Sequence, residues 1–257
     1  MNYPILGKPW HFYCDESGDR NPISKDNCLC FAIIGIPGHI DEKICDKIIK
    51  SCHTKTSKPF FKEILNRLKN YQAITTITHF DLSDNQTANR IIERHSTGMS
   101  GSKLPLKKQA SISNYVWQIA YGLSLFNAIC NVCDEKGRVN NVFVKYHNFP
   151  LKSREKAIFV NFQQWMTERI KDINMKLKDY AKYDYWKAED LYVSDISEAS
   201  EELVQIRVAH HIVKLFRKFY KQSTISQFDN ELKEGNVHIK DLTHQFREWK
   251  LQPNSTW

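Results

Sequence analysis

Residues 10–16 read Trp-His-Phe-Tyr-Cys-Asp-Glu, and residues 28–36 read Cys-Leu-Cys-Phe-Ala-Ile-Ile-Gly-Ile. Aromatic and aliphatic residues dominate both stretches, and each has the length of a β-strand. The residues between them include Ser17-Gly18-Asp19 and Asn21-Pro22, which are typical of loops. Two apolar strands joined by a polar loop predict an antiparallel hairpin at the start of a sheet.

Beyond this hairpin, helical and strand patterns alternate along the chain. We expect helices over about 41–52, 59–70, 111–133, 154–178, 201–221 and 238–249, and strands over 73–79, 141–146 and 191–193. This order predicts a mixed α/β fold around one sheet that is flanked by helices. We expect a single domain over 1–257, with a helical insertion at about 84–135 and a C-terminal helical extension at about 222–257.

The composition bounds the partners and the compartment. The chain has 257 residues, and 37 Lys and Arg against 29 Asp and Glu give a formal charge of +8. This surplus favours a polyanionic partner, nucleic acid before an acidic membrane, although a basic surface without such a role is the open alternative. No stretch approaches the roughly 18 apolar residues of a membrane span, so we expect no membrane partner. Seven scattered cysteines predict reduced thiols in the cytoplasm.

Acidic residues gather where the first predicted strand ends. Residues 14–19 read Cys-Asp-Glu-Ser-Gly-Asp, which places three carboxylates within five residues. Hard cations such as Mg²⁺ take oxygen ligands, and they can activate water and neutralise the charge of a phosphodiester. Asp15 and Glu16 are therefore candidate metal ligands, and an ordinary polar loop is the alternative.

The segment Tyr13-Cys-Asp-Glu-Ser-Gly-Asp19, followed by the apolar run 28–36, resembles the opening of the "DESG" family, domain of unknown function 3800. The resemblance implies a ribonuclease H-like fold and a nuclease that depends on Mg²⁺ or Mn²⁺. Asp15, Glu16 and Asp195 would then bind the metal. His210 or His211 would assist the attack of water on a phosphodiester of RNA or DNA.

The chain departs from the pattern of that family in its second half. Gln205 matches the glutamine of the family's Gln-x-Ala-Asp helix, but Val208 stands where the family has Asp. Ala209-His210 restores the order after a shift of one residue, with His in place of Asp. The strand that begins at about residue 141 leads to His147, where ribonuclease H-like enzymes usually offer a second acid.

Four cations mark the helix expected over 201–221. Arg207, Lys214, Lys218 and Lys221 lie together on a face that differs from the apolar stripe, which suits contacts with phosphates. A solvated surface helix is the alternative.

The sequence leaves three hypotheses about the function. The first is a metal-dependent nuclease, for which the family context points to bacterial or phage-defence roles. The second is a catalytically degenerate nucleic-acid-binding module on the same fold. The third is a subunit that depends on a protein partner, and a homo-oligomer also stays open. No GxxxxGK[ST] or GxGxxG motif supports a nucleotide-binding P-loop or Rossmann reading.

Overall fold

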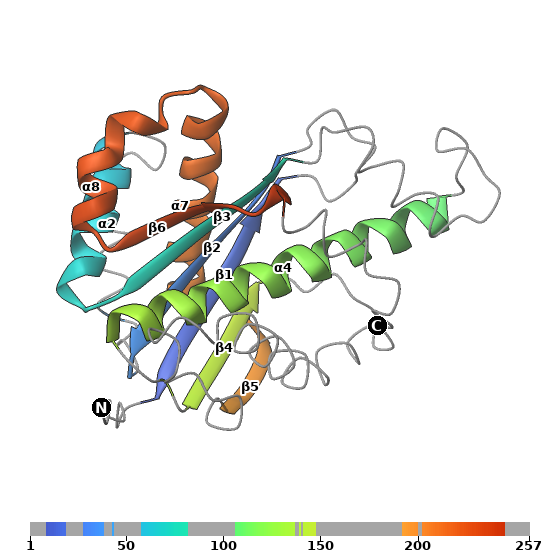
Figure 1. The fold of residues 1–257 in the computed structure, drawn as a ribbon, viewed down its shortest axis with the longest axis horizontal. Helices are drawn as coiled ribbons and strands as arrows, with labels where there is room; N and C mark the ends of the chain where they lie inside the picture. Colours follow the sequence, from blue (N-terminus) through green and yellow to red (C-terminus); the bar gives the residue numbers. More distant parts are fainter. Residues whose placement is uncertain are drawn as a thin grey trace, which may run out of the picture.

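One mixed sheet organises the part of the chain that the computed structural model describes, namely residues 9–18, 28–38, 43, 58–81, 106–136, 139, 141–147, 192–199 and 202–244. Within these ranges six strands lie in the order β5-β4-β1-β2-β3-β6 (Figure 1). Their bounds are β1 Trp10–Ser17, β2 Cys28–Pro37, β3 Ile74–Asp81, β4 Asn141–His147, β5 Tyr192–Ala199 and β6 Val237–Asp241. The predicted mixed α/β architecture is confirmed.

The predicted hairpin forms the centre of this sheet. β1 and β2 pair antiparallel, with Cys14 opposite Ile33, and β2 pairs antiparallel with β3. On its other side β1 pairs parallel with β4, where Cys14 lies opposite Tyr146. The antiparallel hairpin expected from the sequence is therefore confirmed, and β1 has neighbours on both sides.

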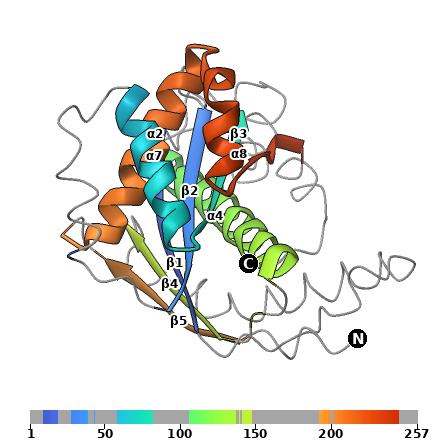
Figure 2. The same ribbon diagram turned by 90° about the vertical axis from the view of Figure 1, so that its left-hand side faces the viewer.

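Helices cover both faces of the sheet (Figures 1 and 2). On one face lie α7 (Val204–Lys221), α2 (Lys58–Asn70) and α8 (Asp229–Glu234), and the long helix α4 (Leu106–Lys136) crosses the other. Because β2 is covered on both sides, apolar residues occupy consecutive positions rather than alternate ones. This double cover explains why residues 28–36 are a continuous apolar run.

The last described segments differ from the sequence-based expectation. Residues 237–241, expected to begin a helix at about 238, form strand β6 and pair parallel with β3. Residues 225–228 form a 3-10 helix (η4). The described part of the helical extension expected at about 222–257 therefore contains a strand as well as helices. A short edge strand lacks a long apolar run, and its pairing depends on a strand some 160 residues earlier in the chain, which local patterns do not reveal.

Other expected elements agree in type and differ in length. The strand expected over 191–193 extends over Tyr192–Ala199, and it is followed later by β6. α4, expected as part of a helical insertion, packs across β2 and β3. The helices expected over about 41–52 and 154–178 fall almost wholly outside the described residues.

Gly18 follows the last residue of β1 and has a backbone conformation that few other residues adopt. Its φ is +130°, and a Cβ built on it would lie 2.3 Å from the carbonyl oxygen of Cys28. Two strands of the hairpin thus approach each other too closely for any side chain at this position. This contact gives the glycine of the Asp-Glu-Ser-Gly segment a structural role.

Replacing Gly18 with alanine tests that role. We expect Gly18→Ala to lower the free energy of unfolding by about 3 kcal/mol, because strained backbone costs about 1–3 kcal/mol and the collision with backbone adds to it. Gly38→Ala is the matched control, since Gly38 also has a positive φ of +75° but has no atom within 4 Å of the built Cβ. Urea unfolding of both variants measures the difference, and equal losses would contradict the close approach.

Candidate functional site

Asp15 is a buried carboxylate at the centre of the sheet. It is 2% exposed and follows Tyr13 on the face that α7 covers. Its Oδ1 accepts a hydrogen bond from the backbone N–H of Glu16 at 2.8 Å. A buried charge is costly unless it is paired and hydrogen-bonded, so the carboxylate of Asp15 needs polar partners inside the protein.

Two histidines supply those surroundings. Nδ1 of His147 lies 3.2 Å from Asp15 Oδ1, and Nδ1 of His210 lies 2.7 Å from Asp15 Oδ2. The two imidazole rings are 6.4 Å apart at their centroids and nearly perpendicular. Each oxygen of the carboxylate therefore faces one imidazole nitrogen, and the three side chains form one cluster.

The fold explains why these residues meet. β4 runs parallel to β1, and its residue Tyr146 lies opposite Cys14, so His147 follows next to Asp15. His210 comes from α7, where Ala209 and Val213 point into the core and His210 lies at the edge of the buried face. The side chain of His147 is 10% exposed, whereas that of His210 is 30% exposed. His210 is thus the member of the cluster that solvent reaches most readily.

This arrangement resembles the carboxylate–histidine pairs that orient imidazoles in proteins. A carboxylate at Nδ1 fixes the tautomer and directs Nε2 toward a partner, as in catalytic histidines and in histidines that bind metals. The cluster can therefore hold or move a proton at His210.

Glu16 does not join Asp15 in this cluster. Successive residues of a strand point to opposite faces, so Glu16 belongs to the face of Phe31, its partner in the register, and of α4. Glu16 is half-buried at the end of β1. The strand therefore directs the side chains of Asp15 and Glu16 to opposite faces, and a metal shared by the two acids stays a prediction.

Asp195 lies at a different level of the sheet from Asp15, measured along the strands. β5 places Asp195 opposite Phe143, four residues before His147 in the neighbouring strand. At about 3.3 Å per residue, this offset amounts to roughly 13 Å along the strand, with one further strand between Asp195 and Asp15. The register therefore places the backbone of Asp195 away from that of Asp15, and the three-acid site stays a prediction.

The donor set in the described part of the chain does not fit a pair of Mg²⁺ or Mn²⁺ ions. Such ions need several converging oxygen ligands, but the cluster has one carboxylate, and both of its oxygens face imidazoles. Among the described residues, no group of three or more His, Cys, Asp and Glu side chains is arranged to hold a metal ion.

His147 is the member of the cluster that sequence reasoning missed. The sequence marked it only as standing at the position of an expected acid. Two signals pointed to it: its place at the end of an apolar strand, and the parallel pairing that a strand–helix–strand order favours.

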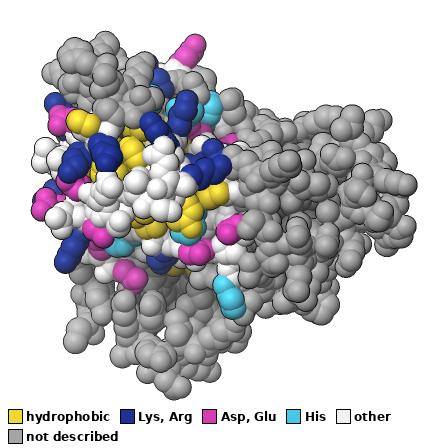
Figure 3. All heavy atoms as spheres, turned by 90° about the horizontal axis from the view of Figure 1, so that it is seen from above, with side chains coloured by type: hydrophobic (Ala, Val, Ile, Leu, Met, Phe, Trp, Pro, Cys, Tyr) yellow, Lys and Arg dark blue, Asp and Glu magenta, His cyan; other side chains and the backbone are white. Residues whose placement is uncertain are grey.

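The expected cations lie on the exposed side of α7. Lys214, Lys218 and Lys221 are exposed, and Arg207 is half-buried. Lys214 follows His210 by four residues, so the two lie on the same side of the helix, about 6 Å apart along its axis. In the face seen in Figure 3, basic and acidic side chains are interspersed over the described part. The spacing of Lys214, Lys218 and Lys221 places these three cations in a row along α7.

Comparisons with known proteins add little. No protein-family model matches the chain, and no curated protein matches its sequence. A chain of the PCNA:RNase HII complex from Archaeoglobus fulgidus is similar in structure, with a TM-score of 0.42 and 13% identity over 85% of this chain and 77% of that one. None of the described helices has the length and apolar character needed to cross a membrane.

A double-mutant cycle tests the cluster. We expect Asp15→Ala and His210→Ala to be coupled by about 1–2 kcal/mol in unfolding free energy, because hydrogen bonds to charged groups contribute about 1.5–3 kcal/mol and His210 is partly exposed. Urea unfolding of the single and double variants measures this coupling.

The control cycle pairs Asp15→Ala with His238→Ala. His238 lies on β6 and contacts Glu135 of α4. Its coupling to Asp15 is expected to stay within about 0.5 kcal/mol, as for distant sites. Equal coupling in the two cycles would show that the Asp15–His210 contact has no specific energy.

Proposed function

We propose that this chain is a nuclease-like protein of the DESG family with a ribonuclease H-like fold, and that it acts on phosphodiesters of nucleic acid. One observation carries the proposal: Asp15 holds His210 by its Nδ1, at the start of an exposed row of cations on α7. The resemblance of residues 13–19 to the family and the surplus of basic residues support the same reading.

The cluster supplies acid–base chemistry in this proposal. His210 takes a proton from the attacking water or ribose hydroxyl, and the imidazolium that forms is stabilised by Asp15. The proton is then returned to the leaving oxygen. His147 is a positioning residue, because it is nearly buried and contacts the other oxygen of Asp15.

The cations of α7 hold the substrate. Lys214 and Lys218 follow His210 by four and eight residues, so both project from the helix near the histidine. Contacts between lysines and phosphates supply affinity without reading the base sequence, and they weaken as salt displaces them. The substrate of this proposal is therefore a nucleic-acid strand that follows α7.

A second candidate function is binding without catalysis. It is favoured by the imidazoles of His147 and His210, which stand where the related enzymes are expected to carry acids. A bound nucleic acid or a protein partner would then use the same face of α7. The dependence on Mg²⁺ or Mn²⁺ expected from the sequence is an alternative to this acid–base proposal, and the cleavage assay distinguishes the two. A defence role and a cytoplasmic location stay predictions.

Cleavage assays separate these functions. We expect the wild-type protein to cut single-stranded RNA, single-stranded DNA or an RNA–DNA hybrid in EDTA. Asp15→Asn and His210→Gln are expected to cut about 100-fold more slowly, the usual effect of losing a general acid–base group. His238→Gln is the matched control and keeps the wild-type rate. Gel analysis of end-labelled substrates gives the rates.

Two outcomes contradict the acid–base proposal. Cleavage that needs added Mg²⁺ or Mn²⁺ would restore the metal-dependent reading, with donors from outside the described residues. Binding without cleavage of any of the three substrates, with or without these cations, would establish the second candidate function.

Salt dependence tests the α7 surface. We expect Lys214→Ala/Lys218→Ala to reduce the slope of log K against log salt by about 1.4–1.8, since each lost phosphate contact removes about 0.7–0.9. Lys69→Ala/Lys233→Ala removes the same charge from exposed positions on α2 and α8 and is the control. Fluorescence anisotropy with a labelled oligonucleotide measures both slopes, and equal slopes would contradict the assignment.

A further inference from the structure

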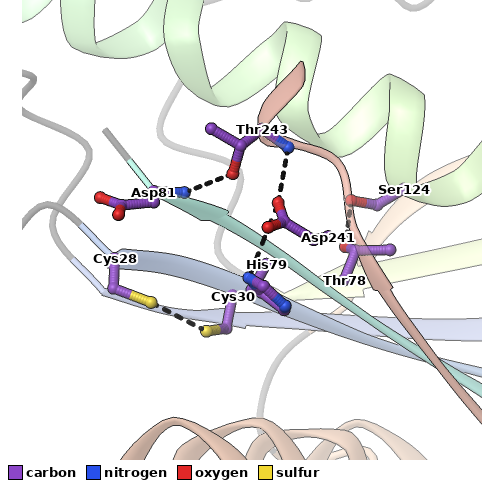
Figure 4. Close-up of polar contacts among 8 residues, drawn as sticks. All are labelled: Cys28, Cys30, Thr78, His79, Asp81, Ser124, Asp241 and Thr243. Carbon is purple, nitrogen blue, oxygen red and sulfur yellow. Dashed lines mark hydrogen bonds and ion pairs between the residues drawn. The ribbon is translucent and has the colours of Figure 1, made fainter. Parts of the chain in front are cut away.

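Two thiols meet at the start of β2, away from the Asp15 cluster. Cys28 and Cys30 are two residues apart in the strand and therefore point to the same face, with their Sγ atoms 3.6 Å apart (Figure 4). Cys28 is half-buried, whereas Cys30 is fully buried. Solvent thus reaches one thiol of the pair, and the other lies directly behind it.

The surroundings distinguish the two thiols. The hydrogen bond between Cys28 and Cys30 lowers the pKa of Cys28, and the nearby cations Arg217 and Lys221 of α7 lower it further, against the effect of burial. The same hydrogen bond and burial raise the pKa of Cys30. Of the two thiols, Cys28 is therefore the one that loses its proton more readily.

The other described cysteines, apart from this pair, do not have the lowered pKa of Cys28. Burial raises the pKa of Cys14 and of Cys130 to about 12 in each case. Burial also holds the pKa of Cys133 well above its usual range. These cysteines are free and chemically inert by comparison. The reactive thiol chemistry of the described residues is thus concentrated at Cys28.

A buried histidine accompanies the pair. His79 lies opposite Cys30 in the pairing of β2 with β3 and is 6% exposed (Figure 4). Its Nδ1 has no hydrogen-bond partner among the described residues, and the nearest carboxylate oxygen, of Asp241, is 3.9 Å away. Burial lowers the pKa of His79, so the ring is neutral near pH 7 and can accept a proton.

We propose that Cys28 and Cys30 are a reversible thiol–disulfide pair that hydroperoxides such as hydrogen peroxide oxidise. The thiolate of Cys28 attacks one peroxide oxygen, the O–O bond breaks, and the products are a sulfenic acid and water once the released hydroxide takes a proton. Cys30 then attacks the sulfenic sulfur while His79 accepts the proton of the Cys30 thiol. The S–O bond breaks, and the leaving hydroxide takes that proton from His79 and departs as water. In total, two thiols and one hydrogen peroxide give one disulfide and two waters.

The position in the strand makes this disulfide labile. Residues two apart in an extended chain have Cα atoms about 6.6–7 Å apart, at the upper limit of roughly 6.8 Å for a disulfide. Closing the bond therefore requires a local shift at Cys28, the first residue of β2. Strained disulfides are reduced readily, as expected of a switch.

Peptide mass mapping of the full chain tests the pair. The reduced protein is treated with a stoichiometric amount of hydrogen peroxide, its remaining thiols are blocked with N-ethylmaleimide after denaturation, and it is digested. We expect the peptide that contains Cys28 and Cys30 to be unblocked and lighter by two hydrogen atoms, and dithiothreitol to reverse the change. The peptides of Cys14 and Cys133 are expected to be blocked.

Variants identify the role of each residue. In Cys30→Ser the reaction stops at the sulfenic acid of Cys28, which dimedone traps, and in Cys28→Ser the thiol at position 30 stays reduced. His79→Gln slows the disulfide step several-fold and leaves sulfenic acid formation unchanged. Cys133→Ser is the control and forms the disulfide like the wild type. Circular dichroism confirms that each variant is folded.

Three results would overturn the proposal. They are a Cys28 sulfenic acid that persists in the wild type, a disulfide between two molecules, and a Cys28–Cys30 peptide that stays fully reduced in the folded protein. None of these results bears on cleavage of nucleic acid, since the assay measures thiol chemistry alone.

Discussion

Burial of the β1–β2 hairpin on both faces is the constraint on which the rest of the structure depends. Side chains of a strand alternate between faces, so the hairpin must satisfy two cores at once. Tyr13 and Asp15 point to α7, while Cys14 and Glu16 point to α4. The alternation therefore separates two neighbouring acids, and Asp15 is the buried acid among the described residues.

A single buried carboxylate needs partners, and the nature of those partners decides its chemistry. Several acids in one buried place repel one another unless a cation binds, whereas a carboxylate between two imidazoles is satisfied by the protein itself. His147 and His210 supply such partners at 3.2 Å and 2.7 Å. With these partners, the carboxylate orients two imidazoles through their Nδ1 atoms.

α7 connects the two polar clusters of this face. Its residue His210 contacts Asp15, and Arg217, seven residues later, donates a hydrogen bond from Nε to the carbonyl of Cys28 at 3.1 Å. The two contacts lie about 10 Å apart along the helix, and both face the hairpin. The outer side of the same helix carries the exposed lysines. One amphipathic helix thus holds the core, the oriented histidine and the cationic row together.

The sequence by itself determined the mixed α/β architecture and the central hairpin, because long apolar runs and polar loops are local signals. It also determined that Asp15 ends a buried strand and that α7 has a cationic side. Only the tertiary structure decided which groups meet. His147 reaches Asp15 through the parallel pairing of β4, Asp195 is displaced by its register, and β6 joins the sheet as an edge strand. These outcomes depend on contacts between residues far apart in the chain, and the pattern of neighbouring residues does not specify the register of those contacts.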